Sequence, residues 1–474
     1  MIYKGFEAVI GLEVHVELKT ATKAFCACST AFGAPPNTAV CPVCMGLPGA
    51  LPVLNARAVE LTMRAGLATA CRVAPYTRFD RKNYSYPDLP KGYQISQQEY
   101  PLCTDGHLMI AINGVKKRIG ITRIHLEEDA GKLLHEDGRT LVDHNRCGVP
   151  LAEIVSAPDL RSADEAKAYL QTLRTVLRFA GVSDCRMQEG ALRCDVNLSV
   201  RRVGCAALGT RTEMKNLNSF RFVARAIEHE FRRQVDLLLS GGTVVQETRR
   251  YDPDTDNTYA MRTKESAADY RFFPEPDLLP LAIREDEIAA LAADMPVMPP
   301  ERCARYQHAW GVPAADAEIL SSDRALADYF EAAAAATPYP RIAASLLVTE
   351  GLRATGAEDF ATPAAPCHLA ELATLLGDEQ INSSTAKKLA GELFASDFSP
   401  RAAVTARGLL QINDEVALAA TVAEAIAENP RALADYRAGK RAARAALVGA
   451  AMAKTRGRAN PRLLSELLDR ALEE

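Results

Sequence analysis

The chain has 474 residues, of which 48% are hydrophobic and 24% charged, with a formal net charge of −4. This length suggests two to four domains, and the near-neutral charge excludes a protein whose whole surface binds nucleic acid, so any RNA partner must meet a local basic patch. The N-terminus lacks the pattern of a signal peptide, and no apolar run approaches the roughly 18 residues of a membrane span. Twelve cysteines then favour a reducing compartment. We expect a soluble cytoplasmic protein without membrane contact.

Up to about residue 280, short runs rich in Gly, Pro, Tyr and Asn predict strands and loops with few long helices. Three runs alternate between apolar and polar residues with the period of a strand: 7–18, 120–132 and 191–200. Two helices are predicted among them, at 161–181, where Ser162 and Glu165 fit a capping box, and at 219–240.

Beyond residue 281 alanine dominates and the hydrophobic periodicity becomes helical. The predicted helices are 284–294, 323–336, 367–376, 383–396, 415–428, 430–437, 441–453 and 461–473. The Pro-rich stretch 295–302 is predicted as a linker or a helix–helix corner. The fold class is therefore α+β, with a large α+β domain at 1–293, an all-α helical domain at 294–405 and a small helical tail domain at 406–474.

The predicted strand at 7–18 carries Glu13, His15 and Glu17 on one face, opposite an apolar face. These groups can ligate a divalent cation, although for one strand alone a polar face turned to solvent is the simpler explanation. The pattern recurs, with polar groups beside apolar residues in four further segments: Arg123, His125, Glu127 and Asp129; Glu153; Arg193, Asp195, Asn197 and Ser199; and Glu213 with Lys215. Together these strands predict a sheet that lines an acidic, metal-holding cleft.

Two adjacent carboxylates leave one ligand open. Alternation sets Glu127 on the face of His125 and sets Glu128 with the apolar residues, unless a strand end or bulge turns Glu128 inward.

An acidic cleft with scattered basic residues suits magnesium-dependent phosphoryl transfer, in which metal ions and cations neutralise the transferring phosphate. The chain has neither GxxxxGK[ST] nor GxGxxG, so any ATP would be held by the sheet face and not by a glycine-rich loop. It also lacks GxSxG and an obvious Ser/Lys amidase signature. The sequence therefore shows no nucleophile for hydrolysing an amide.

Four cysteines form a CxC pair followed by a CxxC pair: Cys26, Cys28, Cys41 and Cys44. Two such pairs can hold a structural zinc ion tetrahedrally, and the alternative is four buried thiols. The stretch 79–97 is predicted as a loop dense in Tyr, Pro and basic residues. This loop either stacks on a base or grips a phosphate, or else it is a rigidly packed loop.

Several of these runs, in order along the chain, resemble the GatB/GatE family, which supplies the B component of the tRNA-dependent amidotransferases. They include GLEVHVEL, FDRKNYSYPDLPKGYQISQ, RIHLEEDAGK, LRCDVNLSV, GTRTEMKNLNSF and DYRFFPEPDL. The ending KTRGRANPRLLSELL (454–468) is similar to the tail of that family, whose GatB/YqeY region corresponds to roughly 325–474.

The resemblance implies a first domain with a glutamine-synthetase-like cradle fold and the cofactors ATP, Mg²⁺ and structural Zn²⁺. It implies a heterotrimer with GatA and GatC, acting as a carbon–nitrogen ligase with glutamine as nitrogen donor. In that complex ATP phosphorylates the side-chain carboxylate of misacylated Glu-tRNA(Gln) and/or Asp-tRNA(Asn). Ammonia released by the GatA glutaminase then displaces phosphate and yields Gln-tRNA(Gln) or Asn-tRNA(Asn).

The resemblance also implies roles for individual residues. The expected catalytic and magnesium-binding residues are Glu13, His15, Glu127, Glu128, Glu153 and Asp195. Lys82 and Lys215 are expected to contact a phosphate or the acylated tRNA end, and Cys26, Cys28, Cys41 and Cys44 to bind zinc. In the mildly basic tail, the residues expected to contact tRNA are Arg441, Arg444, Lys454, Arg456 and Arg458, with a solvated helix face as the alternative.

Two rival functions account for parts of the sequence. A non-catalytic, zinc-bearing tRNA-binding subunit explains the cysteines and the tail but not the acidic faces of several strands. A stand-alone ligase that makes a free small-molecule amide would need neither tRNA nor partner subunits.

Overall fold

The structure is a computed structural model and describes residues 1–263, 267–356, 359–455 and 457–473. The chain divides into two compact units, Met1–Met298 and Pro299–Glu474. Within the described residues, no helix is both long and apolar enough to cross a membrane. The class is mixed α and β, with a large sheet in the first unit and helices throughout the second.

A ten-stranded sheet forms the centre of the first unit, and β2 lies between β12 and β11 within it. Neighbouring strands are antiparallel except for the parallel pair β13 and β14. The strand order is β15 (Asn257–Thr263), β14 (Glu247–Asp252), β13 (Thr212–Lys215), β12 (Leu192–Arg202), β2 (Phe6–Glu17), β11 (Pro150–Ser156), β8 (Val115–Glu128), β7 (Cys103–Ile112) and β3 (Arg72–Val73), with β1 (Ile2–Tyr3) paired to β2.

The apolar face of this sheet is the core of the first unit. On β2 the side chains of Ile10, Leu12 and Val14 are almost fully buried, as alternation predicts. Helices α1 (Ala56–Ala68), α2 (Ala163–Phe179), α3 (Phe220–Leu239) and α4 (Glu285–Ala293) contribute to the same hydrophobic core. The opposite face of the central strands is therefore left for polar side chains.

Smaller elements surround the sheet. The stretch 79–97, predicted as a loop, contains the paired strands β5 and β6, so this expectation was wrong in part. The additional pairings are β16 (Phe273–Pro274) with β5 (Asp80–Asn83) and β6 (Tyr93–Ser96), β9 (Lys132–Glu136) with β10 (Arg139–Asp143), and β4 (Tyr76–Thr77) with β17 (Leu281–Ala282), and a 3₁₀ helix η1 covers Ala267–Tyr270.

The start of α2 differs in one detail from the predicted capping box. Ser162 accepts a hydrogen bond from the backbone N–H of Glu165 (3.1 Å), as predicted. The Glu165 carboxylate, however, accepts from the N–H of Arg161 and from Lys117, and not from the N–H of Ser162. The reciprocal half of the box is thus displaced by one residue.

The second unit contains two separate hydrophobic cores. The first is formed by α5 (Pro299–Trp310), α6 (Ala314–Leu320), α7 (Arg324–Ala335), α8 (Pro340–Leu346), the π-helical turn η2 (Leu347–Gly351), α9 (Leu352–Thr355), α10 (Pro366–Gly377), α11 (Ser383–Ala395) and α12 (Pro400–Ala406). The second is formed by α13 (Glu415–Glu428), α14 (Pro430–Arg437), α15 (Ala442–Lys454) and α16 (Pro461–Glu473).

Local sequence explains many of these helix starts. Asp323, Asn382 and Asp414 accept hydrogen bonds from backbone N–H groups of the first turn. Prolines stand in the first turn of α8, α10, α12 and α14, where no N–H is needed. The Pro-rich stretch 295–302 is only partly a linker, since α5 begins at Pro299.

Candidate functional site

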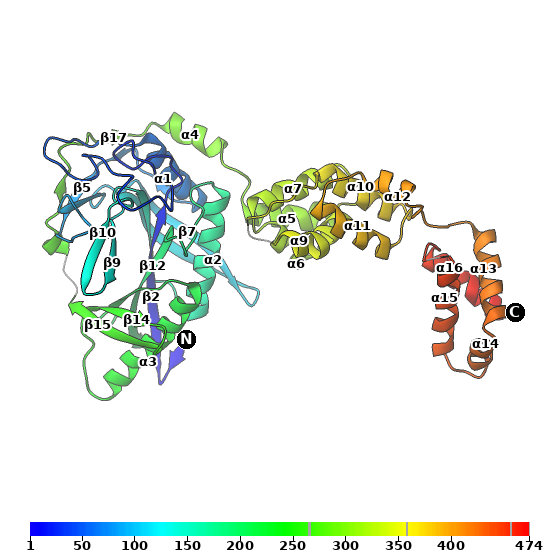
Figure 1. Ribbon diagram of the computed structural model, residues 1–474. Coiled ribbons are helices and arrows are strands. Elements are labelled where there is room, and N and C mark those ends of the chain that lie inside the picture. Colours follow the sequence, from blue (N-terminus) through cyan, green and yellow to red (C-terminus); the bar gives the residue numbers. More distant parts are fainter. Residues whose placement is uncertain (264–266, 357–358, 456, 474) are drawn as a thin grey trace. The chain divides into compact units, whose positions relative to one another are not determined.

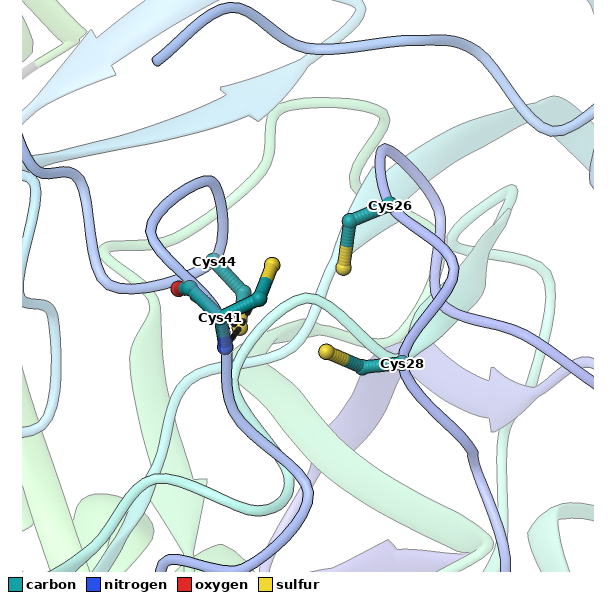
Figure 2. Close-up of side chains that lie close together, drawn as sticks. All are labelled: Cys26, Cys28, Cys41 and Cys44. Carbon is teal, nitrogen blue, oxygen red and sulfur yellow. Dashed lines mark hydrogen bonds between the residues drawn. The ribbon is translucent and has the colours of Figure 1, made fainter.

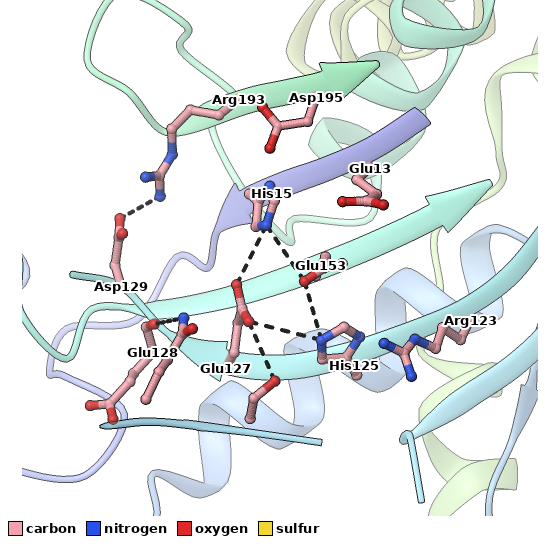
Figure 3. A network of polar contacts seen from close by, with 12 residues as sticks. Glu13, His15, Arg123, His125, Glu127, Glu128, Asp129, Glu153, Arg193 and Asp195 are labelled. Atoms are coloured by element: carbon pink, nitrogen blue, oxygen red, sulfur yellow. Dashed lines mark hydrogen bonds and ion pairs between the residues drawn. The ribbon is translucent and has the colours of Figure 1, made fainter. Parts of the chain in front are cut away.

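Three strands bring together one group of acidic and imidazole side chains. Glu153 on β11 pairs with His15 on β2 and with His125 on β8, so their side chains project from the same face of the sheet. His15 Nε2 lies 3.5 Å from Glu153 and 3.6 Å from Glu127, and His125 Nε2 lies 3.3 Å from Glu153. Figure 3 shows these side chains converging between the strands. We call His15, Glu127 and Glu153 the histidine group.

Burial makes the charges of the histidine group interdependent. Burial alone lowers the pKa of His15, but Glu153 and Glu127 outweigh it and raise this pKa to about 9. Burial and the neighbouring Glu153 raise the pKa of Glu127, whereas His125 and His15 together overcome burial and hold the pKa of Glu153 well below its usual value. Without a bound cation, the group is therefore held together by a protonated imidazole.

A second acidic group lies beside the first, on β2, β12 and β13. Asp195 pairs directly with Glu13, and Glu213 pairs with the neighbouring Asn197. Ligand atoms of Glu13, Asp195 and Glu213 all lie within 4.8 Å of one another. Lys215 forms ion pairs with Asp195 and Glu213, and Asn197 donates to Glu13 at 2.8 Å. We call Glu13, Asp195 and Glu213 the carboxylate group.

The spacing in both groups suits a divalent cation. Around an octahedral Mg²⁺ with bonds of about 2.1 Å, ligand atoms stand about 3.0 Å apart when adjacent and about 4.2 Å apart when opposite. The 3.5 and 3.6 Å separations in the histidine group lie between these values and are too long for hydrogen bonds. Three carboxylates share the single ammonium of Lys215 in the other group. The donor set fits Mg²⁺ in each case.

Glu128 does not lie in either group. Its carboxylate pairs with Lys91 and accepts the backbone N–H of Ile95 at 2.9 Å. Glu127, the preceding residue, lies beside His15 (Figure 3). Glu17, which shares the polar face of β2, interacts instead with Asp129 and Arg193, and its pKa is raised to about 7 by burial and by Asp129.

The two predicted cofactor-binding lysines have different surroundings. Lys215 belongs with the carboxylate group. The Lys82 ammonium lies 4.9 Å from the ring centre of Tyr270 and 5.7 Å from that of Tyr84. It forms no ion pair within the described residues, yet its charge acts on Glu127 by lowering the pKa of that carboxyl against the effect of burial. Lys82 is thus a cation held by aromatic rings beside the histidine group.

The four cysteines of the CxC and CxxC pairs converge, although they come from separate loop segments (Figure 2). All four sulfur atoms lie within 4.8 Å of one another, and those of Cys41 and Cys44 are 3.9 Å apart. Tetrahedral zinc with bonds of about 2.3 Å places its sulfur ligands about 3.8 Å apart. A hydrogen bond from the Cys26 thiol lowers the pKa of Cys44 to about 4. The cluster therefore fits zinc.

Most predicted tRNA contacts of the tail already have partners within the chain. Arg444 pairs with Asp469, and Lys454 pairs with Glu424 and Glu428. Arg458 donates to the backbone carbonyls of Thr455 and Gly408. Arg456 lies outside the described residues. Arg441 is exposed and forms no ion pair in the part of the tail that the structure describes.

Comparison with known proteins agrees with this arrangement. The GatB/GatE catalytic domain matches residues 8–289, and a second, GatB domain matches residues 328–472. Together these matches cover most of the chain. The chain belongs to the GatB/GatE family.

Full-length relatives share one name, the B subunit of the aspartyl/glutamyl-tRNA(Asn/Gln) amidotransferase. The relative from Moorella thermoacetica is 51% identical over 474 residues, covering 98% of this chain and 100% of the relative. The relative from Geobacter sulfurreducens is 50% identical over 477 residues, covering 99% of this chain and 100% of the relative. Both acidic groups lie within the part that matches the GatB/GatE catalytic domain.

Three residues near the acidic groups were missed or undervalued from sequence. His125 contacts both Glu127 and Glu153, and its Nδ1 is buried without a partner in the described structure. Its alternation with Glu127 was a usable signal. Glu213 was noticed but not chosen, because only the pairing of β12 with β13 brings it to Glu13. Lys91 had no sequence signal, since its partner Glu128 is distant along the chain.

Proposed function

We propose that this GatB/GatE family member is the carboxylate-activating subunit of a tRNA-dependent amidotransferase. Its substrates would be Glu-tRNA(Gln) and/or Asp-tRNA(Asn), and its cofactors ATP and Mg²⁺. The observation that carries the proposal is the pair of adjacent groups on one sheet face, one with His15 and one with Glu13. The names of the relatives support the same reaction.

The reaction has two steps with balanced chemistry. A side-chain carboxylate oxygen of the aminoacyl group attacks the γ-phosphorus of ATP, giving an acyl phosphate and ADP. Ammonia then attacks the acyl carbon, the carbon–oxygen bond to phosphate breaks, and an amide, phosphate and a proton are released. Bound Mg²⁺ would neutralise charge on the transferring phosphoryl group.

The side chains of this chain would hold the two reactants in line. The histidine group and the carboxylate group, which would hold the cations, stand on neighbouring strands and so fix the spacing between them. Lys82 and Lys215 supply positive charge at either side. We assign Glu127 and not Glu128 to the histidine group, because Glu128 is occupied by Lys91. His125 orients Glu153 from behind.

We also propose the division of labour along the chain. Residues 1–293 would form the glutamine-synthetase-like cradle that carries the reaction, with a structural zinc in the Cys26, Cys28, Cys41 and Cys44 cluster. Residues 294–405 would form a helical domain and residues 406–474 the tRNA-binding tail. Because no nucleophile for amide hydrolysis is evident in the sequence, ammonia would come from GatA in a complex that also contains GatC.

The experiment reconstitutes the complex with GatA and GatC and measures magnesium-dependent ATP hydrolysis with and without Glu-tRNA(Gln) or Asp-tRNA(Asn). Stimulation by an acylated tRNA, with formation of the corresponding amide, is the expected result. A non-catalytic tRNA-binding subunit predicts tRNA binding without stimulated hydrolysis. A stand-alone ligase predicts hydrolysis driven by a free amino acid without partners.

A further inference from the structure

Lys23 has a fully buried side chain and lies among the thiols of the cysteine cluster. Its exposed fraction is 0%. The ammonium lies 3.5 Å from Cys44 Sγ and donates to the backbone carbonyl of His144 at 3.3 Å. It forms no ion pair with a carboxylate within the described residues. Burying an ammonium is costly unless an anion compensates it, so the thiolates are the anion that this lysine meets.

We propose that Lys23 is a positioning residue of the cysteine cluster, where its ammonium hydrogen-bonds to Cys44, balances part of the cluster's charge and ties the cluster to the loop of residues 143–149. This inference rests on the proposed zinc site. Four thiolates around Zn²⁺ carry a net charge of −2, and a buried cation beside them lowers the cost of enclosing that charge. The backbone N–H of Cys41 also donates to Cys44, at 3.2 Å.

The loop of residues 143–149 connects Lys23 to the strand that carries Glu127. Beside the bond from Lys23 to His144, the N–H of Ala24 donates to Gly148 at 2.7 Å. The N–H of Gly148 donates in turn to Asp129, directly after β8. Gly148 has a φ of +81°, and a Cβ there would come within 3.6 Å of both Cys44 and Lys23. The cluster is thus connected by a few direct contacts to the end of β8.

A zinc-affinity measurement on the full chain tests the first half of the proposal. Lys23→Met keeps the length of the side chain and removes its charge and its N–H donors. We expect zinc affinity, measured by competition with a chromophoric chelator, to fall about 10- to 100-fold, the range for residues that support metal ligands. Lys19→Met is the matched control, because Lys19 is exposed and pairs with Asp184. Equal affinity of Lys23→Met and wild type would overturn the proposal, whereas a wild-type chain that binds no zinc would refute the zinc site itself.

A second variant covers a folding failure of the first. Lys23→Gln keeps an N–H donor and loses only the charge, so its zinc affinity should fall by at least about threefold. The spectrum of the cobalt-substituted protein gives an independent measure, because a lost hydrogen bond to sulfur shifts the thiolate-to-cobalt absorption bands. Unchanged affinity and unchanged bands in Lys23→Gln would also overturn the proposal.

Hydrogen exchange tests the connection to the loop. In zinc-saturated Lys23→Met, peptides that cover residues 143–149 should exchange faster than in wild type. A peptide from β12, which lies outside these contacts, should not change. Wild-type exchange in residues 143–149 of the variant would contradict the structural connection, even if zinc affinity fell.

Discussion

His15 lies between carboxylates of two neighbouring strands, and its replacement tests the histidine group directly. In His15→Ala, Glu127 and Glu153 would lose the imidazole that lies between them. We expect formation of the amidated tRNA to fall at least about 100-fold, the scale on which single preorganised electrostatic groups act. Glutamine hydrolysis by the partner GatA should stay measurable. Glu7→Gln is the control, because Glu7 lies on the same strand but pairs with Arg201. Wild-type amidation by His15→Ala would exclude the assignment.

The adjacent residues Glu127 and Glu128 predict different responses to magnesium. Glu127→Gln removes a ligand candidate that lies beside His15, so the Mg²⁺ concentration for half-maximal ATP hydrolysis should rise at least about tenfold. Glu128→Gln breaks a pair with Lys91, so that concentration should stay near the wild-type value even if the rate falls. A magnesium titration of both variants decides the question, and the reverse order of effects would reassign the ligand.

At the residue scale, alternation along a strand could be predicted, but pairing between strands could not. The period of two predicted that Glu127 shares a face with His125 and that Glu13 shares one with His15. The division into two groups depends on register, such as Asp195 opposite Glu13, which joins residues far apart in the chain. One sequence contains no direct signal for that register. The partner of Glu128 is hidden for the same reason.

At the element scale, a buried polar network joins α3 to the edge of the sheet. The Glu230 side chain is fully buried, accepts from Thr212 at 2.9 Å and from Arg233 at 2.7 Å, and pairs with Arg249. Glu230→Gln would leave the two arginines without their shared anion. We expect a loss of roughly 3 kcal/mol in the free energy of unfolding, as for other broken buried pairs. Denaturant unfolding measures it, with the exposed neighbour Glu228→Gln as a control that should change little.

The same network predicts a dependence on pH. Burial alone would raise the pKa of Glu230, but Arg233, Gln234 and Arg249 leave it below its ordinary value. A carboxyl whose pKa is lower when folded stabilises the fold fully above its unfolded pKa of about 4.3 and loses that contribution as the pH falls through the folded pKa. The stability difference between wild type and Glu230→Gln should therefore shrink as the pH falls below about 4. A difference that stays constant from pH 6 down to acid unfolding would contradict this role.

Helices with strong caps and clear periodicity could be predicted, and others could not. The predicted ranges 219–240 and 415–428 agree closely with α3 and α13, whose caps are Ser219 and Asp414. Helix α1 was missed because it lies in a region of strands and loops, although Asn55 caps it. The loop at 79–97 contains β5 and β6, whose pairing depends on contacts across the intervening turn. Local signals identified elements where they were strong, and tertiary pairing determined the others.

At the scale of the whole molecule, the two helical cores of the second unit suggest where the tail can be cut. Leu409 packs against the first core and Ile412 against the second. Removing residues 411–474 should therefore leave the first core complete. We expect the truncated chain to assemble with its partners but to use tRNA poorly, as measured by size-exclusion chromatography and by the KM for acylated tRNA. Unchanged tRNA kinetics would argue against a role for the tail in tRNA binding.

Charge substitutions on the intact tail separate RNA contact from loss of structure. Arg437 and Arg441 are exposed and form no ion pair among the described tail residues, whereas Arg444 is engaged by Asp469. If each free guanidinium meets one phosphate, Arg437→Gln with Arg441→Gln should weaken tRNA binding and reduce the salt dependence of log Kd by about one for each lost contact. Arg444→Gln should instead lower the stability of the tail with less change in this slope. Binding measured across a salt series distinguishes these effects, and an unchanged slope in the double variant would show that the two arginines only face solvent.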